Sequence, residues 1–416
     1  GKSAFRDRGY LMSWFALRAA GLGFLVACLH FSPAISKAQT DSKPAVNENR
    51  ENTGSLRDQM HGFYNLLAEY KPWLSSPSKP LDDEQKKILQ DRLQGFVNGA
   101  QKLTRMTKTG SSSFRIAAQG LHQQSVRVQN QLENSHTERA FIELQKSQNL
   151  CMGCHVQGVS QDATGIPFVL DLKAMPQENA FEDAEFLFLT RRFRKAIPIY
   201  SWMLRNYPNA VVNREQLQVC AWRKLVFFTR ISQNPQLGLA SLKKDLVNDK
   251  LPFSLQKELK LWVKNMETWA QEGAAPTNPV EIHSQALKFY QENVRQQRTI
   301  GSESPHLVAL LRHTGQLYQA LPSIDSKRVS LQAKILLLLG QMEKAINPQI
   351  YRSSPSLYFQ HCAQRLSKTP TARSCLTEWK TQLLGVHQVE ALSQLPKSVR
   401  KAWKKTEKKI QTSADK

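Results

Sequence analysis

The segment Cys151-Met152-Gly153-Cys154-His155 holds the residues best suited to chemistry in this chain of 416 residues. Two thiols at this spacing on a helical turn can each form a thioether with one vinyl group of a porphyrin. The imidazole that follows the second thiol can then coordinate the iron from the proximal side. The pattern C-x-x-C-H therefore predicts one covalently attached haem c, bound through Cys151 and Cys154, with His155 as the fifth ligand.

Three other uses of these cysteines fit the chain less well. A thioredoxin-like redox pair requires a strand–helix–strand context, whereas the residues before the segment follow a helical pattern. A structural zinc site needs four ligands, usually with a second close pair, and the sequence offers no such pair. A disulfide between Cys151 and Cys154 would leave His155 without a role.

An apolar segment near the N-terminus indicates export. Residues 19–31 are apolar and follow three arginines, and a proline and small residues lead on to Ala38. A membrane-spanning helix needs about 20 apolar residues, so this shorter run favours a signal peptide over residues 1–38, cut after Ala38. The alternative is a lipid anchor on Cys28, which ends a lipobox-like sequence. Both interpretations predict an exported protein, with a periplasmic location, and haem c is attached outside the cytoplasm.

Charge and hydropathy limit the class of protein. The chain carries 57 Lys and Arg against 34 Asp and Glu, and 41% of its residues are hydrophobic. It is too polar for a multi-span membrane protein and too apolar for a disordered chain. Residues 1–38 hold five basic residues and one acidic residue, so the net charge falls from +23 to +19 without them. This excess favours an acidic redox partner protein or an anionic membrane surface, and no nucleic acid is expected for an exported chain.

Helical periodicity predicts an all-α fold. After a linker at 39–53, four amphipathic segments within 54–157 predict an antiparallel four-helix bundle, with the haem motif at the end of its last helix. The residues expected to face inward in these segments are Leu56, Met60, Phe63, Leu67, Tyr70, Leu89, Leu93, Phe96, Ala100, Leu103, Phe114, Ala117, Leu121, Val128, Leu132, Phe141 and Leu144.

The rest of the chain is also expected to be helical. Glycines and a proline mark a linker at 158–176, and helices in pairs follow over 177–390. The segment 193–208 resembles the second helix of a tetratricopeptide repeat, but no strict period of about 34 residues continues after it. We therefore expect a degenerate helical-hairpin array, with an irregular helical domain as the alternative. Further helices are expected at 213–230, 237–247, 254–271, 279–297, 305–320, 326–345, 355–367 and 371–385.

The last segment, residues 391–416, is strongly basic. It holds eight basic residues, and four apolar residues, Leu395, Val399, Trp403 and Ile410, lie near one helical face. The simplest expectation is a solvated, frayed terminus. The alternative is a basic amphipathic helix that lies on an anionic membrane surface or an acidic protein.

The position of the haem motif resembles one family. In the cytochrome c prime family and its low-spin relatives, four antiparallel helices carry C-x-x-C-H on the last helix, whereas small cytochromes c carry it near the start. Arg57-Asp58-Gln59-Met60 is similar to the first-helix segment of that family. The resemblance covers roughly residues 53–157, about a quarter of the chain.

The resemblance implies roles for residues of the first helix. In that family a basic residue lies near the haem propionates and a methionine or apolar residue faces the distal side. It implies Arg57 near a propionate and Met60 as the sixth ligand, with His61 and Met106 as alternatives. If Met60 is instead a core residue, the iron is five-coordinate and open to small gases, or it takes another ligand.

The remaining cysteines and histidines have structural interpretations. Cys362 and Cys375 flank a probable helix–helix turn and predict a disulfide in an exported protein, with two buried thiols as the alternative. Cys220 lies in an apolar helix and is expected to be a buried free thiol. Seven other histidines form no metal-spaced cluster and are expected at the surface or as helix caps, and Glu182, Asp183 and Glu185 are expected on a solvated face. These histidines are His122, His136, His283, His306, His313, His361 and His387.

Motifs of the common enzyme classes are absent from the sequence. It contains no G-x-S-x-G segment, phosphate-binding loop, H-E-x-x-H segment or Rossmann fingerprint. The expected function is therefore that of an exported monohaem c-type cytochrome, a one-electron carrier with a partner-binding helical domain, rather than an enzyme. Haem enzyme activity, a haem-based gas or redox sensor and a scaffold with a structural haem remain alternatives.

Overall fold

The structure is a computed structural model of the whole chain. It describes residues 60, 62–65, 82–106, 112–134, 136, 139–140, 143–144, 179–273, 275–350 and 355–414. The chain divides into two compact units, Gly1–Thr53 and Gly54–Lys416, and all described residues belong to the second unit.

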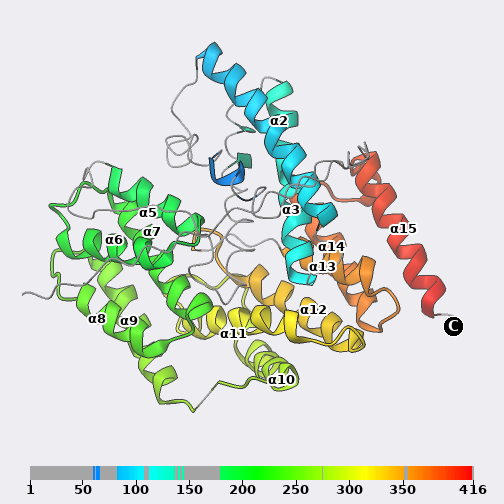
Figure 1. Cartoon of the computed structure of the whole chain (residues 1–416). Coiled ribbons are helices and arrows are strands. Elements are labelled where there is room, and N and C mark those ends of the chain that lie inside the picture. The colour runs from blue at the N-terminus through cyan, green and yellow to red at the C-terminus, as the bar shows by residue number, and fades with distance from the viewer. Residues whose placement is uncertain are drawn as a thin grey trace, which may run out of the picture. The chain divides into compact units, whose positions relative to one another are not determined.

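The described residues are helical, which confirms the all-α prediction (Figure 1). Their only extended pairing is an isolated bridge between Ile300 and Ile346. No helix among them is long and apolar enough to cross a membrane. The helices are α2 Asp83–Met106, α3 Ser112–Glu133, α5 Ala180–Leu189, α6 Phe193–Asn206, α7 Arg214–Val226, α8 Pro235–Asp245, α9 Phe253–Gln271, α10 Pro279–Phe289, α11 Leu307–Ala320, α12 Val329–Ala345, α13 Pro355–Arg365, α14 Thr371–His387 and α15 Lys397–Ala414.

Asparagine caps explain where several of these helices begin. Asn213 and Gln216 form a capping box at the start of α7, with hydrogen bonds of 2.8 and 3.0 Å. Asn234 and Asn278 accept backbone N–H groups at the starts of α8 and α10, and a proline occupies the first position of each helix. An Asn oxygen satisfies an orphan N–H group, and proline has no N–H to satisfy.

Four helical segments contribute to one apolar cluster, which we call the bundle cluster. Phe63 packs edge-on against Phe96, with ring centroids 5.2 Å apart. Met60 and Phe114 pack against the cluster from its edge. Its buried members are Phe63, Leu93, Phe96, Ala100, Leu103, Ala118, Leu121, Val128, Leu132, Ala140 and Leu144. Residues expected to face inward on all four segments are thus in contact.

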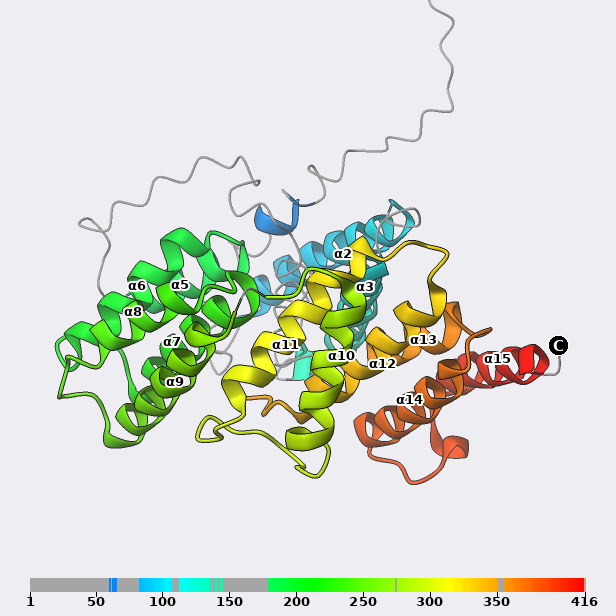
Figure 2. The same ribbon diagram turned by 90° about the horizontal axis from the view of Figure 1, so that it is seen from below.

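The helices from α5 onward share a second, larger core. Most consecutive helices pack against each other, whereas α8 packs on the turn Phe227–Ile231 and on α9, and α9 packs on α11 rather than α10. In addition, α6 packs on α8, α10 on α12 and α12 on α14. Figure 2 shows this succession from the green helices to the red one. Two π-helical turns, η3 (Phe227–Ile231) and η4 (Tyr290–Val294), extend α7 and α10. We call α5–α14 the helical array.

The bundle cluster and the helical array are joined through α3. Ile116 belongs to the core of the array, whereas Leu121 and Val128 on the same helix belong to the bundle cluster. The helix packs against α13. Tyr64 adds a second contact, since its ring lies 5.1 Å from that of Phe186 in α5. One helix therefore serves both cores.

The C-terminal segment forms a docked helix, so the expectation of a frayed terminus was wrong. Leu395, Trp403 and Ile410 are buried, and α15 packs against α13 and α14. The apolar face of this segment has a partner surface within the protein, and burial of its large side chains stabilises the helix.

Candidate functional site

The haem motif and its first-helix neighbours lie outside the described residues. These residues are Cys151, Cys154, His155, Arg57 and His61. Leu144, seven residues before Cys151 in the sequence, is the last member of the bundle cluster along the chain.

Met60 is the one sixth-ligand candidate that the structure places on the bundle cluster. Its side chain is half-buried and packs against the cluster one turn before Phe63. Met106, the last residue of α2, is also half-buried but is not part of the cluster. A thioether serves equally well as core filler and as a ligand of haem iron.

Polar contacts fix α3 against the segment that leads to the motif. The side-chain amide of Gln124 donates to the carbonyl oxygen of Glu143 at 2.8 Å and also contacts the Glu143 carboxylate. Beside it, the Ser125 hydroxyl donates to the carbonyl oxygen of His122 at 2.8 Å. Gln124 is buried, so its bonds set the register at which the segment of Glu143 meets α3, whereas the bond of the buried Ser125 lies within α3 itself.

Three basic side chains meet where α3 packs on α13. His361 is buried, which corrects the expectation of a surface residue. Burial and, to a smaller extent, the charges of Arg115 and Arg365 lower the pKa of His361 to about 3. Burial and Arg365 also lower the pKa of Arg115. At neutral pH this histidine is therefore an uncharged member of the contact.

His313 in α11 is a second histidine that was wrongly expected at the surface. Its ring packs against that of Phe289 in α10, with centroids 4.9 Å apart. Burial and the adjacent Arg312 lower the pKa of His313 to about 4, although Gln316 acts in the opposite direction. It is thus a neutral core residue rather than a titrating site near neutral pH.

The remaining cysteines are located in the helical array. Cys362 in α13 and Cys375 in α14 form a disulfide, with Cα atoms 6.0 Å apart and both residues buried. Cys220 is a buried free thiol, as expected, and its sulfur lies 4.0 Å from that of Met203. Burial raises the pKa of Cys220 well above its usual value, and Glu185 adds to this rise. The thiol is therefore kept unreactive.

Buried ion pairs of the array were not foreseen. Arg230 in η3 pairs with Glu343 in α12 at 2.8 Å, and neither side chain is exposed. Arg230 also donates to the Thr314 hydroxyl at 2.9 Å, and its guanidinium lies 5.9 Å from the Tyr318 ring centre. The only signal in the sequence is a basic residue within the apolar run after Leu225.

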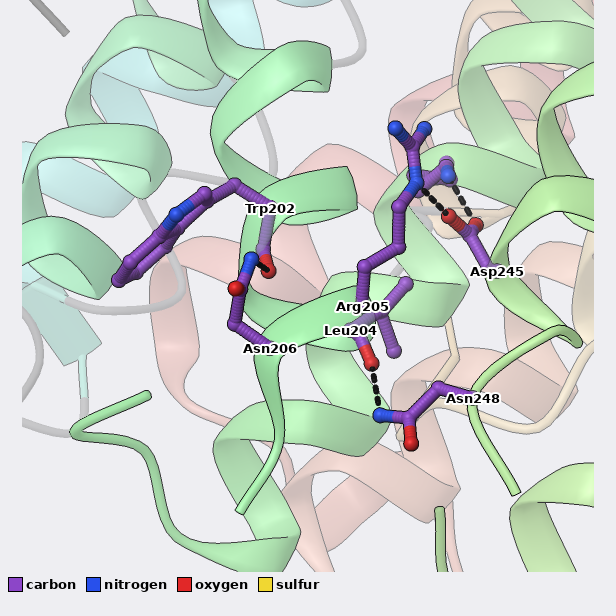
Figure 3. A network of polar contacts seen from close by, with 7 residues as sticks. Trp202, Leu204, Arg205, Asn206, Asp245 and Asn248 are labelled. Atoms are coloured by element: carbon purple, nitrogen blue, oxygen red, sulfur yellow. Dashed lines mark hydrogen bonds and ion pairs between the residues drawn. The ribbon is translucent and has the colours of Figure 1, made fainter. Parts of the chain in front are cut away.

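A second buried pair links α6, α7 and α8. Asp245 accepts from Lys224, and from Arg205 at 3.1 Å. Figure 3 shows Arg205 reaching Asp245, and the Asn248 amide donating to the Leu204 carbonyl oxygen at 2.9 Å. These contacts hold the α8–α9 connection against the end of α6.

Glu185 corrects the expectation of a solvated acidic face on α5. Its carboxylate accepts from the Tyr200 hydroxyl at 2.6 Å and from Arg223 at 2.8 Å. Burial and the carboxylate of Glu185 raise the pKa of Tyr200. The acidic residue therefore links three helices of the array instead of facing solvent.

The described residues contain no group of three or more His, Cys, Asp and Glu side chains arranged to hold a metal ion. The chain matches no protein-family model, and neither a curated protein nor a solved structure is similar to it.

Proposed function

We propose that this protein is an exported monohaem c-type cytochrome that carries single electrons. The observation that supports this most is the bundle cluster. It gathers residues from four helical segments, includes Met60 at its edge and ends at Leu144, seven residues before Cys151. An apolar interior directly before C-x-x-C-H is suited to covering a porphyrin.

The residues present fit a haem of this type. Cys151 and Cys154 would form the thioethers, His155 would be the proximal ligand, and Met60 would be the distal ligand, with His61 as the alternative. Arg57 would neutralise a propionate. The iron would supply a reversible one-electron change. The apolar side chains of the bundle cluster would exclude water, and a Met60 thioether would favour a raised reduction potential.

At the level of the fold, we propose a bundle over 54–157 similar to the cytochrome c prime family and a degenerate tetratricopeptide-like array over 177–390. The cluster from four segments supports the bundle. The packing of most neighbouring helices and of several alternate helices supports the array. We further propose a periplasmic location after cleavage at Ala38, with a lipid anchor at Cys28 as the alternative.

A haem-based gas or redox sensor is the second candidate, and the sharing of α3 favours it. Because α3 contributes to both cores, a movement of α3 caused by a rearrangement in the bundle cluster would also change its contact with α13. This candidate requires an open distal position, whereas the electron carrier requires a ligand there.

Absorption spectra of the reduced holoprotein separate the two candidates. A carrier ligated by Met60 should show a low-spin ferrous spectrum that carbon monoxide changes slowly or not at all. A high-spin ferrous spectrum that responds at once to carbon monoxide would favour the sensor. The matched control is the Met60→Ala variant, which should bind carbon monoxide readily if Met60 is the ligand.

A further inference from the structure

The helix α15 carries an unusual concentration of positive charge. Its 18 residues contain seven Lys and Arg and a single acidic residue, Glu407. Trp403, Thr406 and Ile410 are buried and lie on one side of the helix, which packs against α13 and α14. The apolar side of α15 is therefore fully used within the protein.

The opposite side of α15 is a row of exposed lysines, which we call the lysine face. At about 100° per residue, these lysines centre opposite the buried side. Among the residues that the structure describes, none of them has an ion-pair partner. The lysine face consists of Lys397, Lys401, Lys404, Lys405 and Lys408.

Such an arrangement is unfavourable for the isolated protein. Lysines three or four positions apart on a helix repel one another by about 0.2–0.5 kcal/mol per pair. The one carboxylate of the helix, Glu407, lies three positions from Lys404, and the other lysines of the face have no carboxylate at a spacing of three or four. The folded protein thus maintains a concentrated charge that an external anionic surface would neutralise.

The charge extends beyond α15. Residues 355–414 contain eleven Lys and Arg against three acidic residues, and one of the acidic residues, Glu378, is paired with Lys344. The helix α13 packs against both α15 and α3, as Figure 1 shows for the orange, red and cyan helices. Burial lowers the pKa of His387 at the end of α14, and Arg127 of α3 lies close enough to lower this pKa as well. The basic region therefore continues to the helix that borders the bundle cluster.

We propose that the lysine face of α15 is a docking surface for an acidic face of a partner protein. A helix that lies in a membrane surface inserts its apolar side, and here that side packs on α13 and α14. Hydrated lysines favour fast, salt-sensitive and reversible contact, which suits a transient complex. That the partner exchanges electrons rests on the proposed function, whereas the docking itself does not require the haem.

Binding of two labelled probes to the full-length holoprotein tests this proposal. The probes are a short polyglutamate peptide and vesicles of equal parts phosphatidylglycerol and phosphatidylcholine. Binding is measured by fluorescence anisotropy and by sedimentation, from low salt to about 0.15 M, where the Debye length is about 8 Å. The haem content of each sample is determined separately, so that failure of docking and failure of the haem proposal are distinguishable.

Two sets of variants make the test specific. The first replaces four residues of the lysine face and the second replaces four exposed lysines of the helical array, so both change the net charge equally. A Lys→Gln version of the first set excludes an effect of new repulsion, and circular dichroism checks folding. The sets are K401E/K404E/K405E/K408E and K244E/K250E/K260E/K288E.

The proposal predicts salt-sensitive binding of the peptide that weakens about tenfold or more in the first set and less than about twofold in the second. The Lys→Gln version should also weaken binding. Equal losses of peptide affinity in both sets would mean that net charge alone determines binding, which would overturn the proposal. Binding to vesicles without binding to the peptide, or no binding by the wild-type protein, would overturn it as well.

Discussion

Arg230 and Glu343 form an ion pair within the helical array, with Nη2 and Oε1 2.8 Å apart and a sequence separation of 113. Neither side chain has exposed surface. Gly315 lies against the backbone of Arg230, where an added Cβ would come within 2.8 Å of its Cα atom. The pair is thus enclosed by η3, α11 and α12, far from screening solvent.

Removing one partner of this pair should destabilise the protein strongly. Arg230→Met or Glu343→Gln should lower the free energy of unfolding by about 3–5 kcal/mol, because the remaining group is left buried without its partner. Removing both, as R230M/E343L, should be less damaging than the worse single change. Urea unfolding followed by circular dichroism measures these values.

An exposed ion pair provides the control for this prediction. Lys257 and Glu303 lie 3.2 Å apart with 62% and 59% of their side chains exposed. Lys257→Met should therefore change the free energy of unfolding by no more than about 1 kcal/mol. A loss from Arg230→Met as small as that from Lys257→Met would contradict the importance of the buried pair.

Met60 is expected to set the properties of the haem iron. Met60→Ala should lower the reduction potential and open the ferrous iron to carbon monoxide, because a thioether stabilises the reduced state and occupies the distal position. Potentiometric titration and absorption spectra test both effects. Met106→Ala is the matched control and should leave them unchanged. If Met60→Ala leaves the potential and spectra unchanged, Met60 is only a core residue.

Stability should fall as the pH is lowered below the usual pKa of histidine. The folded protein holds the pKa of His361 at about 3, whereas an unfolded histidine titrates near about 6.5. Between these values the unfolded state binds the additional proton, so acidification favours unfolding. From pH 7 to pH 5, His361 should account for a loss of about 2 kcal/mol.

A histidine variant isolates this contribution. In His361→Gln the decrease in the free energy of unfolding between pH 7 and pH 5 should be smaller than in the wild-type protein by that amount. His136 is exposed, and His136→Gln should leave the decrease as it is. Identical pH dependence in wild type and His361→Gln would show that this histidine does not stay neutral in the folded state.

The disulfide between Cys362 and Cys375 should stabilise the end of the array. It closes a loop with a sequence separation of 13, for which restriction of the unfolded chain contributes about 3 kcal/mol. The C362A/C375A variant should therefore melt at a lower temperature than the oxidised protein and should be insensitive to reductant. Cys220→Ala should keep its sensitivity to reductant. A wild-type melting temperature that reductant does not change would contradict a stabilising disulfide.

Local sequence patterns predicted helix positions well where caps and prolines mark the ends. The expected helix at 279–297 appears as α10 followed by the π-helical turn η4, and that at 371–385 appears as α14. The π-helical turn after α7 was not predicted. It contains Arg230, whose partner Glu343 is far away in the sequence, so local patterns give no sign of this contact. A hydrophobic period does not reveal such a turn.

Local sequence patterns could not predict the burial or pairing of residues that depend on long-range contacts. His361 is buried because α13 packs on α3, and Glu185 is paired because Arg223 of α7 reaches its carboxylate. Trp403 and Ile410 could be placed on one helical face from the sequence, but not the surface of α13 and α14 that covers this face. The C-x-x-C-H segment is the opposite case, since the haem attachment that we propose for it depends on five adjacent residues alone.

Haem staining of the mature protein on a denaturing gel tests the central claim most directly. The protein is produced in a periplasm with an active cytochrome c maturation system, beside the Cys151→Ala/Cys154→Ala variant. We predict a stained band at the mass of the mature chain, a pyridine haemochrome yield of about one haem per chain and no stain for the variant. An unstained wild-type protein, exported and folded in the same cells, would contradict the proposal of a c-type cytochrome.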